Sequence, residues 1–114
     1  MLEAGGMGIF KAGQRVKRMK VFVEVITAPN CPHSPKAFRA AQRIVTTMKD
    51  VVLEEVNTIT QQGQERADSY GIKSTPVIAI NGRVAYVGLP KEPELKHMIE
   101  MALREERDRQ NYYL

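Results

Sequence analysis

The chain has 114 residues, of which 43% are hydrophobic and 26% are charged, and this is the size and composition of one globular domain. It has a single cysteine, which excludes an intramolecular disulfide and a zinc site built from several thiolates of this chain. The net charge of +4 comes entirely from residues 1–20, and the rest of the chain is electrically balanced. A balanced body without aromatic residues interleaved among basic ones has no groove-reading surface, so we expect no nucleic-acid partner.

Residues 1–19 show neither a helical nor a strand periodicity, and four of them are glycine. We expect a flexible basic leader over these residues, then one domain over residues 20–109 and a frayed polar tail over residues 110–114. The leader lacks the apolar stretch of a secretory signal, and no segment approaches the roughly 20 apolar residues that span a bilayer. The sequence therefore predicts a cytoplasmic protein with no membrane partner, and we expect a monomer.

The first regular element expected after the leader is a buried strand. Residues 20–27 are almost continuously apolar and rich in β-branched side chains, which is typical of a strand covered on both faces. Residues 28–35 contain three prolines and indicate a turn that leads into a helix. Residues 36–49 carry apolar side chains at steps of three and four, so they form one stripe of an amphipathic helix.

The middle of the chain has weaker signals. Residues 51–56 predict a short strand, and residues 58–70 predict a helix that Gly63 interrupts and Gly71 ends. The side chains expected to face inward from this helix are Ile59, Ala67 and Tyr70.

A hairpin and a helix complete the chain. Residues 77–80 and 83–87 are apolar runs separated by Asn81-Gly82, a dipeptide that favours the two positive φ angles of a type I′ turn. A final helix begins near Glu92. The order is then β-α-β-α-β-β-α, which indicates one mixed α/β sheet with helices on both faces and the two most apolar strands, the first and third, at its centre.

Cys31 is the candidate nucleophile, because it lies between a buried strand and the start of an amphipathic helix. The free N–H groups and the positive dipole end of a helix favour a thiolate over a thiol. His33 supplies a hydrogen bond or a positive charge to that thiolate, and Ser34 supplies a hydroxyl. A lone cysteine is often an inert core residue, but three neighbouring prolines and a polar flank argue against a core position here.

Two motifs resemble the thioredoxin-fold family: Cys-Pro-His-Ser at residues 31–34 between strand and helix, and Tyr-Gly-Ile-Lys-Ser-Thr-Pro at residues 70–76 before the hairpin. The resemblance covers about residues 20–105 and is closest to the glutaredoxin-like units of archaeal protein disulfide oxidoreductases and to small archaeal thioredoxins. It implies a four-stranded mixed sheet in the order 2-1-3-4, flanked by three helices.

The resemblance also implies roles for residues at the second motif. Pro76 is expected to follow a cis peptide bond and to pack beside Cys31. Thr75 is then expected to present its backbone to an extended substrate segment, and Pro32 and Pro76 are the other expected substrate contacts. We expect no bound organic cofactor and no metal, with protein disulfides as substrates and glutathione or another small thiol as a co-substrate.

The main departure from the family is Ser34, which stands where the usual Cys-x-x-Cys site has its second cysteine. A second thiol resolves the mixed disulfide that the first one forms, and a serine cannot. The sequence therefore predicts a monothiol exchange protein whose mixed disulfide is resolved by an external thiol. Two alternatives stay open: a non-catalytic module that binds a peptide or partner, and an engineered Cys-to-Ser trap of a dithiol oxidoreductase.

Three other residues are weaker candidates. Glu24 interrupts the apolar first strand and is interpreted either as a semi-buried proton acceptor or as an exposed strand-end residue. Gly88 is interpreted as a place where a small thiol approaches the backbone or as a turn. His97 lies on the polar side of the last helix, where we expect solvent rather than a ligand.

Overall fold

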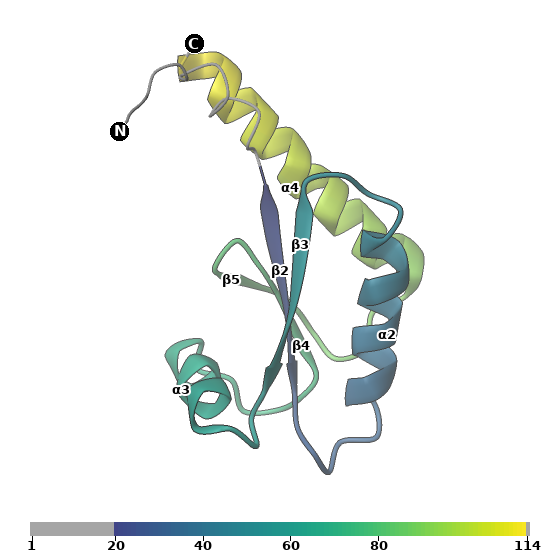
Figure 1. The fold of residues 1–114 in the computed structure, drawn as a ribbon, viewed down its shortest axis with the longest axis vertical. Coiled ribbons are helices and arrows are strands. Elements are labelled where there is room, and N and C mark those ends of the chain that lie inside the picture. Colours follow the sequence, from purple (N-terminus) through teal and green to yellow (C-terminus); the bar gives the residue numbers. More distant parts are fainter. Residues whose placement is uncertain (1–19, 114) are drawn as a thin grey trace, which may run out of the picture.

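The computed structural model describes residues 20–113 and has the predicted β-α-β-α-β-β-α order (Figure 1). The leader, residues 1–19, lies outside the described part. The seven elements are β2 (Val21–Thr27), α2 (Ser34–Val45), β3 (Val51–Asn57), α3 (Gln61–Ser69), β4 (Val77–Ile80), β5 (Arg83–Val87) and α4 (Glu92–Tyr113).

The four strands form one mixed sheet in the spatial order β3-β2-β4-β5. Counted along the chain this is 2-1-3-4, as expected. The pair β2 and β3 is parallel, and both other pairs are antiparallel. All four residues of β4 are buried, as are six of the seven in β2. The two most apolar strands therefore occupy the centre, because only central strands are covered on both faces and at both edges.

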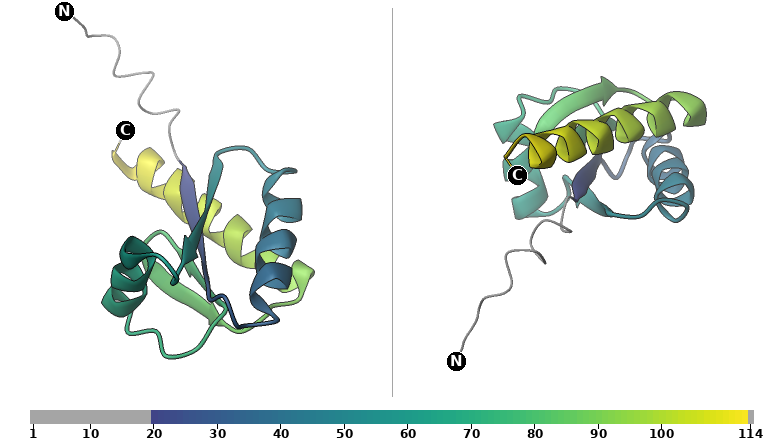
Figure 2. Two further views of the ribbon diagram at one scale, coloured as in Figure 1. Left: turned by 60° about the horizontal axis from the view of Figure 1, so that its bottom comes forward. Right: turned by 90° about the horizontal axis from the view of Figure 1, so that it is seen from above.

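Helices cover the two faces of the sheet unequally (Figures 1 and 2). Alternate side chains of β2 point to opposite faces. On one face the core is formed by residues of β2, α2 and α4, and the β2 residues in it are Val21, Val23 and Val25. On the other face Ile26 of β2 packs with Ala67 of α3, and this second core also contains Val56 and Val77. The short helix α3 is the one described helix on its face.

The predicted hairpin turn is confirmed. Asn81 and Gly82 both have positive φ, 51° and 81°, as a type I′ turn requires. Asn81 also attaches the turn to the start of β2, because its N–H donates to the carbonyl of Phe22 at 2.8 Å and its side-chain oxygen accepts from the N–H of Phe22 at 2.9 Å.

Two expectations about helices were wrong. Ile59, expected to face inward, is 69% exposed, because α3 begins only after its N-cap Thr60 and leaves Ile59 in the preceding loop. The tail expected to fray from residue 110 is helical as far as Tyr113. Its polar residues include good helix formers, and an ion pair between Arg109 and Glu106 one turn away supports the helix.

None of the helices described here is long and apolar enough to cross a membrane.

Candidate active site

Cys31 lies in the connection between β2 and α2, where it is partly exposed. The connection is closed by two successive turns: the N–H of Cys31 donates to the carbonyl of Ala28 at 3.3 Å, and the N–H of Ser34 donates to the carbonyl of Cys31 at 3.2 Å. Pro35 occupies the first turn of α2, where its missing N–H costs least. The thiol is therefore held at the start of the helix by local backbone hydrogen bonds.

Ser34 is the buried member of the motif, with 2% of its surface exposed. Its hydroxyl oxygen accepts a hydrogen bond from the N–H of Ala28 at 3.2 Å, so the side chain fastens the end of β2 to the start of α2. Its two neighbours, His33 and Pro35, are both exposed. The residue that replaces a second cysteine thus points into the protein.

A second chain segment reaches the thiol from far along the sequence. The peptide bond between Thr75 and Pro76 is cis, as expected, and Pro76 is fully buried. The Cys31 thiol donates to the backbone carbonyl of Thr75 at 3.2 Å, across 44 residues of sequence. Gly88 borders the same segment, because its N–H donates to the carbonyl of Pro76 at 2.8 Å, and its φ of 110° suits glycine.

These surroundings lower the pKa of Cys31 to about 7. The largest cause is a hydrogen bond from the Ser34 side chain, and the next is one from the Thr75 side chain, which stabilise the thiolate. Partial desolvation opposes them, and the backbone N–H groups of His33 and Ser34 add smaller stabilising contributions. The Thr75 carbonyl, by contrast, accepts from the protonated thiol, but the net effect favours ionisation. Near neutral pH a large share of Cys31 is therefore the nucleophilic form.

The group of His33 that lowers the pKa of Cys31 differs from the one expected. The sequence predicts that the imidazole stabilises the thiolate, but the contribution of His33 to the lowered pKa comes from its backbone N–H. His33 is the N-cap of α2, its side chain makes no capping hydrogen bond, and it is exposed. The backbone N–H remains in His33→Ala, so we expect that variant to keep this contribution.

These assignments predict the pH dependence of alkylation. In the parent, the rate of reaction with iodoacetamide should rise with pH to a midpoint of about 7, because only the thiolate reacts. Ser34→Ala should move the midpoint upward, since it removes the largest stabilising contribution. His33→Ala is the matched control and should leave the midpoint unchanged. An upward shift in His33→Ala as large as that in Ser34→Ala would return the leading role to the imidazole.

Glu24 is buried, and its carboxylate is fully engaged by α3. Arg66 donates to both carboxylate oxygens, at 2.8 and 3.0 Å, and the Tyr70 hydroxyl donates to one of them. Burial raises the pKa of Glu24, but the Arg66 and Tyr70 hydrogen bonds and the Arg66 charge outweigh it, so the pKa is lowered. A carboxylate held ionised by these partners is a structural ion pair rather than a proton acceptor for Cys31.

No local pattern of residues predicted Arg66 and Tyr70 as the partners of Glu24, which lies more than 40 residues away from both. Arg66 lies on α3 and Tyr70 is the C-cap of that helix, and their spacing of one helical turn is the only local signal that they act together. His97 is exposed, in line with its interpretation. Within the described residues, no three His, Cys, Asp or Glu side chains gather in a way that could bind a metal ion.

Comparison with known proteins agrees with this geometry. A family model described as a thioredoxin domain matches residues 19–100. A thioredoxin of Methanocaldococcus jannaschii is 36% identical over 74% of this chain and 98% of its own length. A probable thioredoxin of Methanothermobacter thermautotrophicus is also 36% identical, over 68% of this chain and 89% of its own.

The fold is shared with solved structures as well. A mutant thioredoxin from Halobacterium salinarum superposes with a TM-score of 0.63, covering 78% of this chain and 80% of that one, at 20% identity. At that identity the likeness shows the fold alone. The family match and the relatives above extend it to the sequence, and this chain belongs to the thioredoxin family of thiol-disulfide oxidoreductases.

Proposed function

We propose that this chain is a monothiol member of its family, with Cys31 as the sole nucleophile. The Cys31 thiolate attacks one sulfur of a substrate disulfide and forms a mixed disulfide, while the other substrate sulfur leaves as a thiolate. An external thiolate then attacks the substrate sulfur of the mixed disulfide, forms a new disulfide with it, and releases Cys31 as a thiolate. The observation that carries this proposal is the contact of Cys31 with Thr75 on one side, together with a buried serine on the other.

Thr75 and Pro76 supply the binding surface for an extended substrate. The protonated thiol of Cys31 donates a hydrogen bond to the carbonyl of Thr75, and ionisation of the thiol removes this hydrogen bond. The carbonyl is then available to accept an N–H from a substrate strand, as in β-augmentation. Pro32 is exposed next to the thiol and adds an apolar contact. Substrate docking and nucleophile formation are thereby coupled.

The resolving reactant in this proposal is glutathione or another small thiol, and the substrates are protein disulfides, in keeping with relatives named thioredoxin. The proposed site of action is the cytoplasm, where thiols keep such exchange directed toward reduction. The exchange itself needs no metal and no organic cofactor, because sulfur supplies both the nucleophile and the leaving group. We propose that the protein acts as a monomer.

The test is the fate of the mixed disulfide. The parent, mixed with a disulfide-containing protein such as insulin, should accumulate an adduct visible on a non-reducing gel and absent in Cys31→Ser. Added glutathione should release the adduct and support turnover. A parent that forms no adduct and alkylates only with the midpoint of an ordinary thiol would contradict the exchange reaction and favour the binding module.

A further inference from the structure

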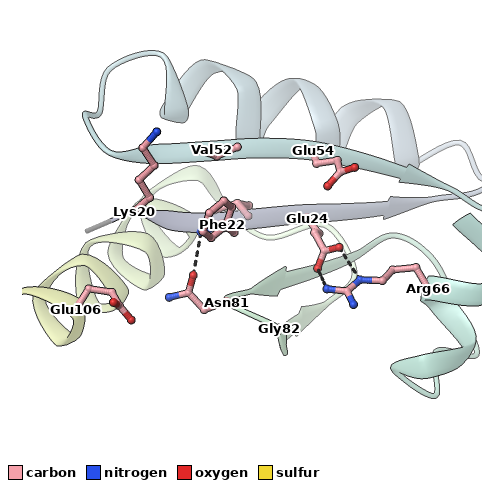
Figure 3. Close-up of a pocket in the computed structure, with 10 residues that line it drawn as sticks. Lys20, Phe22, Glu24, Val52, Glu54, Arg66, Asn81, Gly82 and Glu106 are labelled. Carbon is pink, nitrogen blue, oxygen red and sulfur yellow. Dashed lines mark hydrogen bonds and ion pairs between the residues drawn. The ribbon is translucent and has the colours of Figure 1, made fainter. Parts of the chain in front are cut away.

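Glu24 is a buried charge in a central strand of the sheet, and no step of the proposed exchange uses it. It is 8% exposed, and its register partner on β4 is the small residue Ala79. Arg66 of α3 binds both of its carboxylate oxygens (Figure 3). Replacing a buried ion pair by well-packed apolar residues is often neutral or stabilising, so stability alone does not explain an ionised group at this position.

The partners of Glu24 connect two chain segments that meet at the active site. Cys31 follows the end of β2, the strand that contains Glu24. Tyr70 is the C-cap of α3, and Thr75 lies five residues further along, just before β4. The Tyr70 hydroxyl donates to the Glu24 carboxylate, and Arg66 donates to that hydroxyl at 2.8 Å. The Glu24 cluster, defined here as Glu24, Arg66 and Tyr70, therefore ties the segment that carries the thiol to the start of the segment that carries Thr75.

The turn after Tyr70 passes this position on to the next residues. Gly71 has a φ of 68°, and its N–H donates to the carbonyl of Asp68 at 2.9 Å. The N–H of Ile72 donates to the carbonyl of Ala67 at 3.1 Å. These are the two hydrogen bonds of a Schellman motif, which fixes the direction in which a chain leaves a helix. Tyr70 and Ile72 also pack against the core beneath α3, so the end of this helix sets the path of the chain at Ile72.

From this turn to β4 the position of the chain depends on its two ends. Within residues 20–113, neither Lys73 nor Ser74 takes part in a backbone–backbone hydrogen bond, and both residues are exposed. The far end is held at Pro76, whose carbonyl accepts a hydrogen bond from the residue after β5. A displacement of the near end therefore moves Thr75. A few tenths of an ångström are enough to weaken a contact such as the one of 3.2 Å between the Cys31 thiol and the Thr75 carbonyl.

We propose that the Glu24 cluster holds Thr75 in position against Cys31, so that its three members are positioning residues of the exchange site. The inference rests on the exchange reaction proposed for Cys31. Loss of the cluster should raise the pKa of Cys31, because the Thr75 side chain is one of the groups that stabilise the thiolate. A direct effect of the Glu24 charge has the opposite sign, since removal of a nearby negative charge lowers the pKa of a thiol.

The midpoint of Cys31 alkylation against pH tests the proposal. Tyr70→Phe removes the hydroxyl and keeps the ring, and it should raise the midpoint by at least about 0.5 pH units, which lowers the rate at pH 6 roughly threefold. Glu24→Gln should also raise it. The matched control is Tyr86→Phe, which removes the hydroxyl of a tyrosine that packs against the core on the opposite face and should leave the midpoint unchanged. Tyr70→Phe keeps both bonds between Glu24 and Arg66, so it decides even if Glu24→Gln unfolds.

A double-mutant cycle shows whether Tyr70 acts through Thr75. Thr75→Val removes the side-chain hydroxyl that stabilises the thiolate and should raise the midpoint by itself. In the Thr75→Val background, Tyr70→Phe should add less than roughly half of the shift that it causes in the parent, because residues that act through one another are not additive. A general loss of stability would not produce this coupling.

Three results would overturn the proposal. The first is an unchanged midpoint in Tyr70→Phe, and the second is a fall of the midpoint in Glu24→Gln, which would show that the charge acts directly. The third is a full Tyr70→Phe shift in the Thr75→Val background. Alkylation requires only the Cys31 thiolate, so these midpoints decide the positioning even if the parent forms no adduct with insulin, a result that would contradict the exchange reaction instead.

Discussion

Replacing Ser34 with cysteine is expected to turn the chain into a dithiol oxidoreductase that forms an internal disulfide with Cys31. The hydrogen bond from the Ser34 N–H to the Cys31 carbonyl, 3.2 Å long, closes a four-residue turn. Such a turn holds the two Cα atoms within about 7 Å, and disulfides need roughly 4.4 to 6.8 Å. The Ser34 side chain already interacts with the Cys31 sulfur, so the new thiol would start in the right direction.

The expected gain is large because the resolving thiol becomes intramolecular. Without added thiol, single-turnover reduction of insulin by reduced Ser34→Cys should exceed that of the parent by at least roughly a hundredfold, since well-placed groups reach very high effective concentrations. Mass spectrometry should show the oxidised variant two hydrogens lighter than the reduced one. Ser34→Ala is the control and should not gain activity. A Ser34→Cys protein that forms no internal disulfide would show that this loop differs from the redox sites of the family.

The second large effect is expected from Gly63→Ala, and its sign runs against helix propensity. Alanine in place of a helical glycine normally stabilises by about 1 kcal/mol. Here a Cβ atom at position 63 would lie 1.9 Å from the backbone carbonyl oxygen of Asn57 and 2.9 Å from the Thr60 hydroxyl oxygen. The helix α3 must move away from the end of β3, and its N-cap hydrogen bond from Gly63 to Thr60 must stretch.

We expect Gly63→Ala to lower the free energy of unfolding by about 1 to 3 kcal/mol, as overpacking usually does. In a domain of this size that corresponds to a fall in Tm of roughly 5 to 20 °C. Thermal and urea denaturation measure it, with the exposed neighbour Gln62→Ala as a control that should remain within about 0.5 kcal/mol of the parent. A rise in Tm for Gly63→Ala would mean that α3 does not approach β3 this closely.

Local patterns in the sequence were sufficient for the fold. The alternation of strand and helix followed from apolar periodicity, and the central strands followed from their continuous apolar runs. The Asn81-Gly82 turn followed from the φ angles that these residues tolerate. The motif around Cys31 and the one ending at Pro76 were enough to place both halves of the site in one family, and the structure brings them into contact.

Polarity by itself was a poor guide at two places. Ile59 is apolar yet exposed, because it precedes the N-cap of α3, and the polar residues after 109 are helical. A hydrophobic residue faces inward only if its element places it there, and a polar segment of good helix formers can continue a helix that packing has already started.

The sequence by itself determined the order of elements, the topology of the sheet and the position of the candidate nucleophile, because each depends on residues that are neighbours in the chain or on family motifs. Only the tertiary structure decided the partners: Thr75 for Cys31, Arg66 for Glu24, and Asn57 for Gly63. The physical reason is that a change of a few tenths of an ångström in the distance between two atoms decides whether they form a hydrogen bond or a steric clash. Strand register and helix docking set those distances between segments, and no local pattern of residues records them.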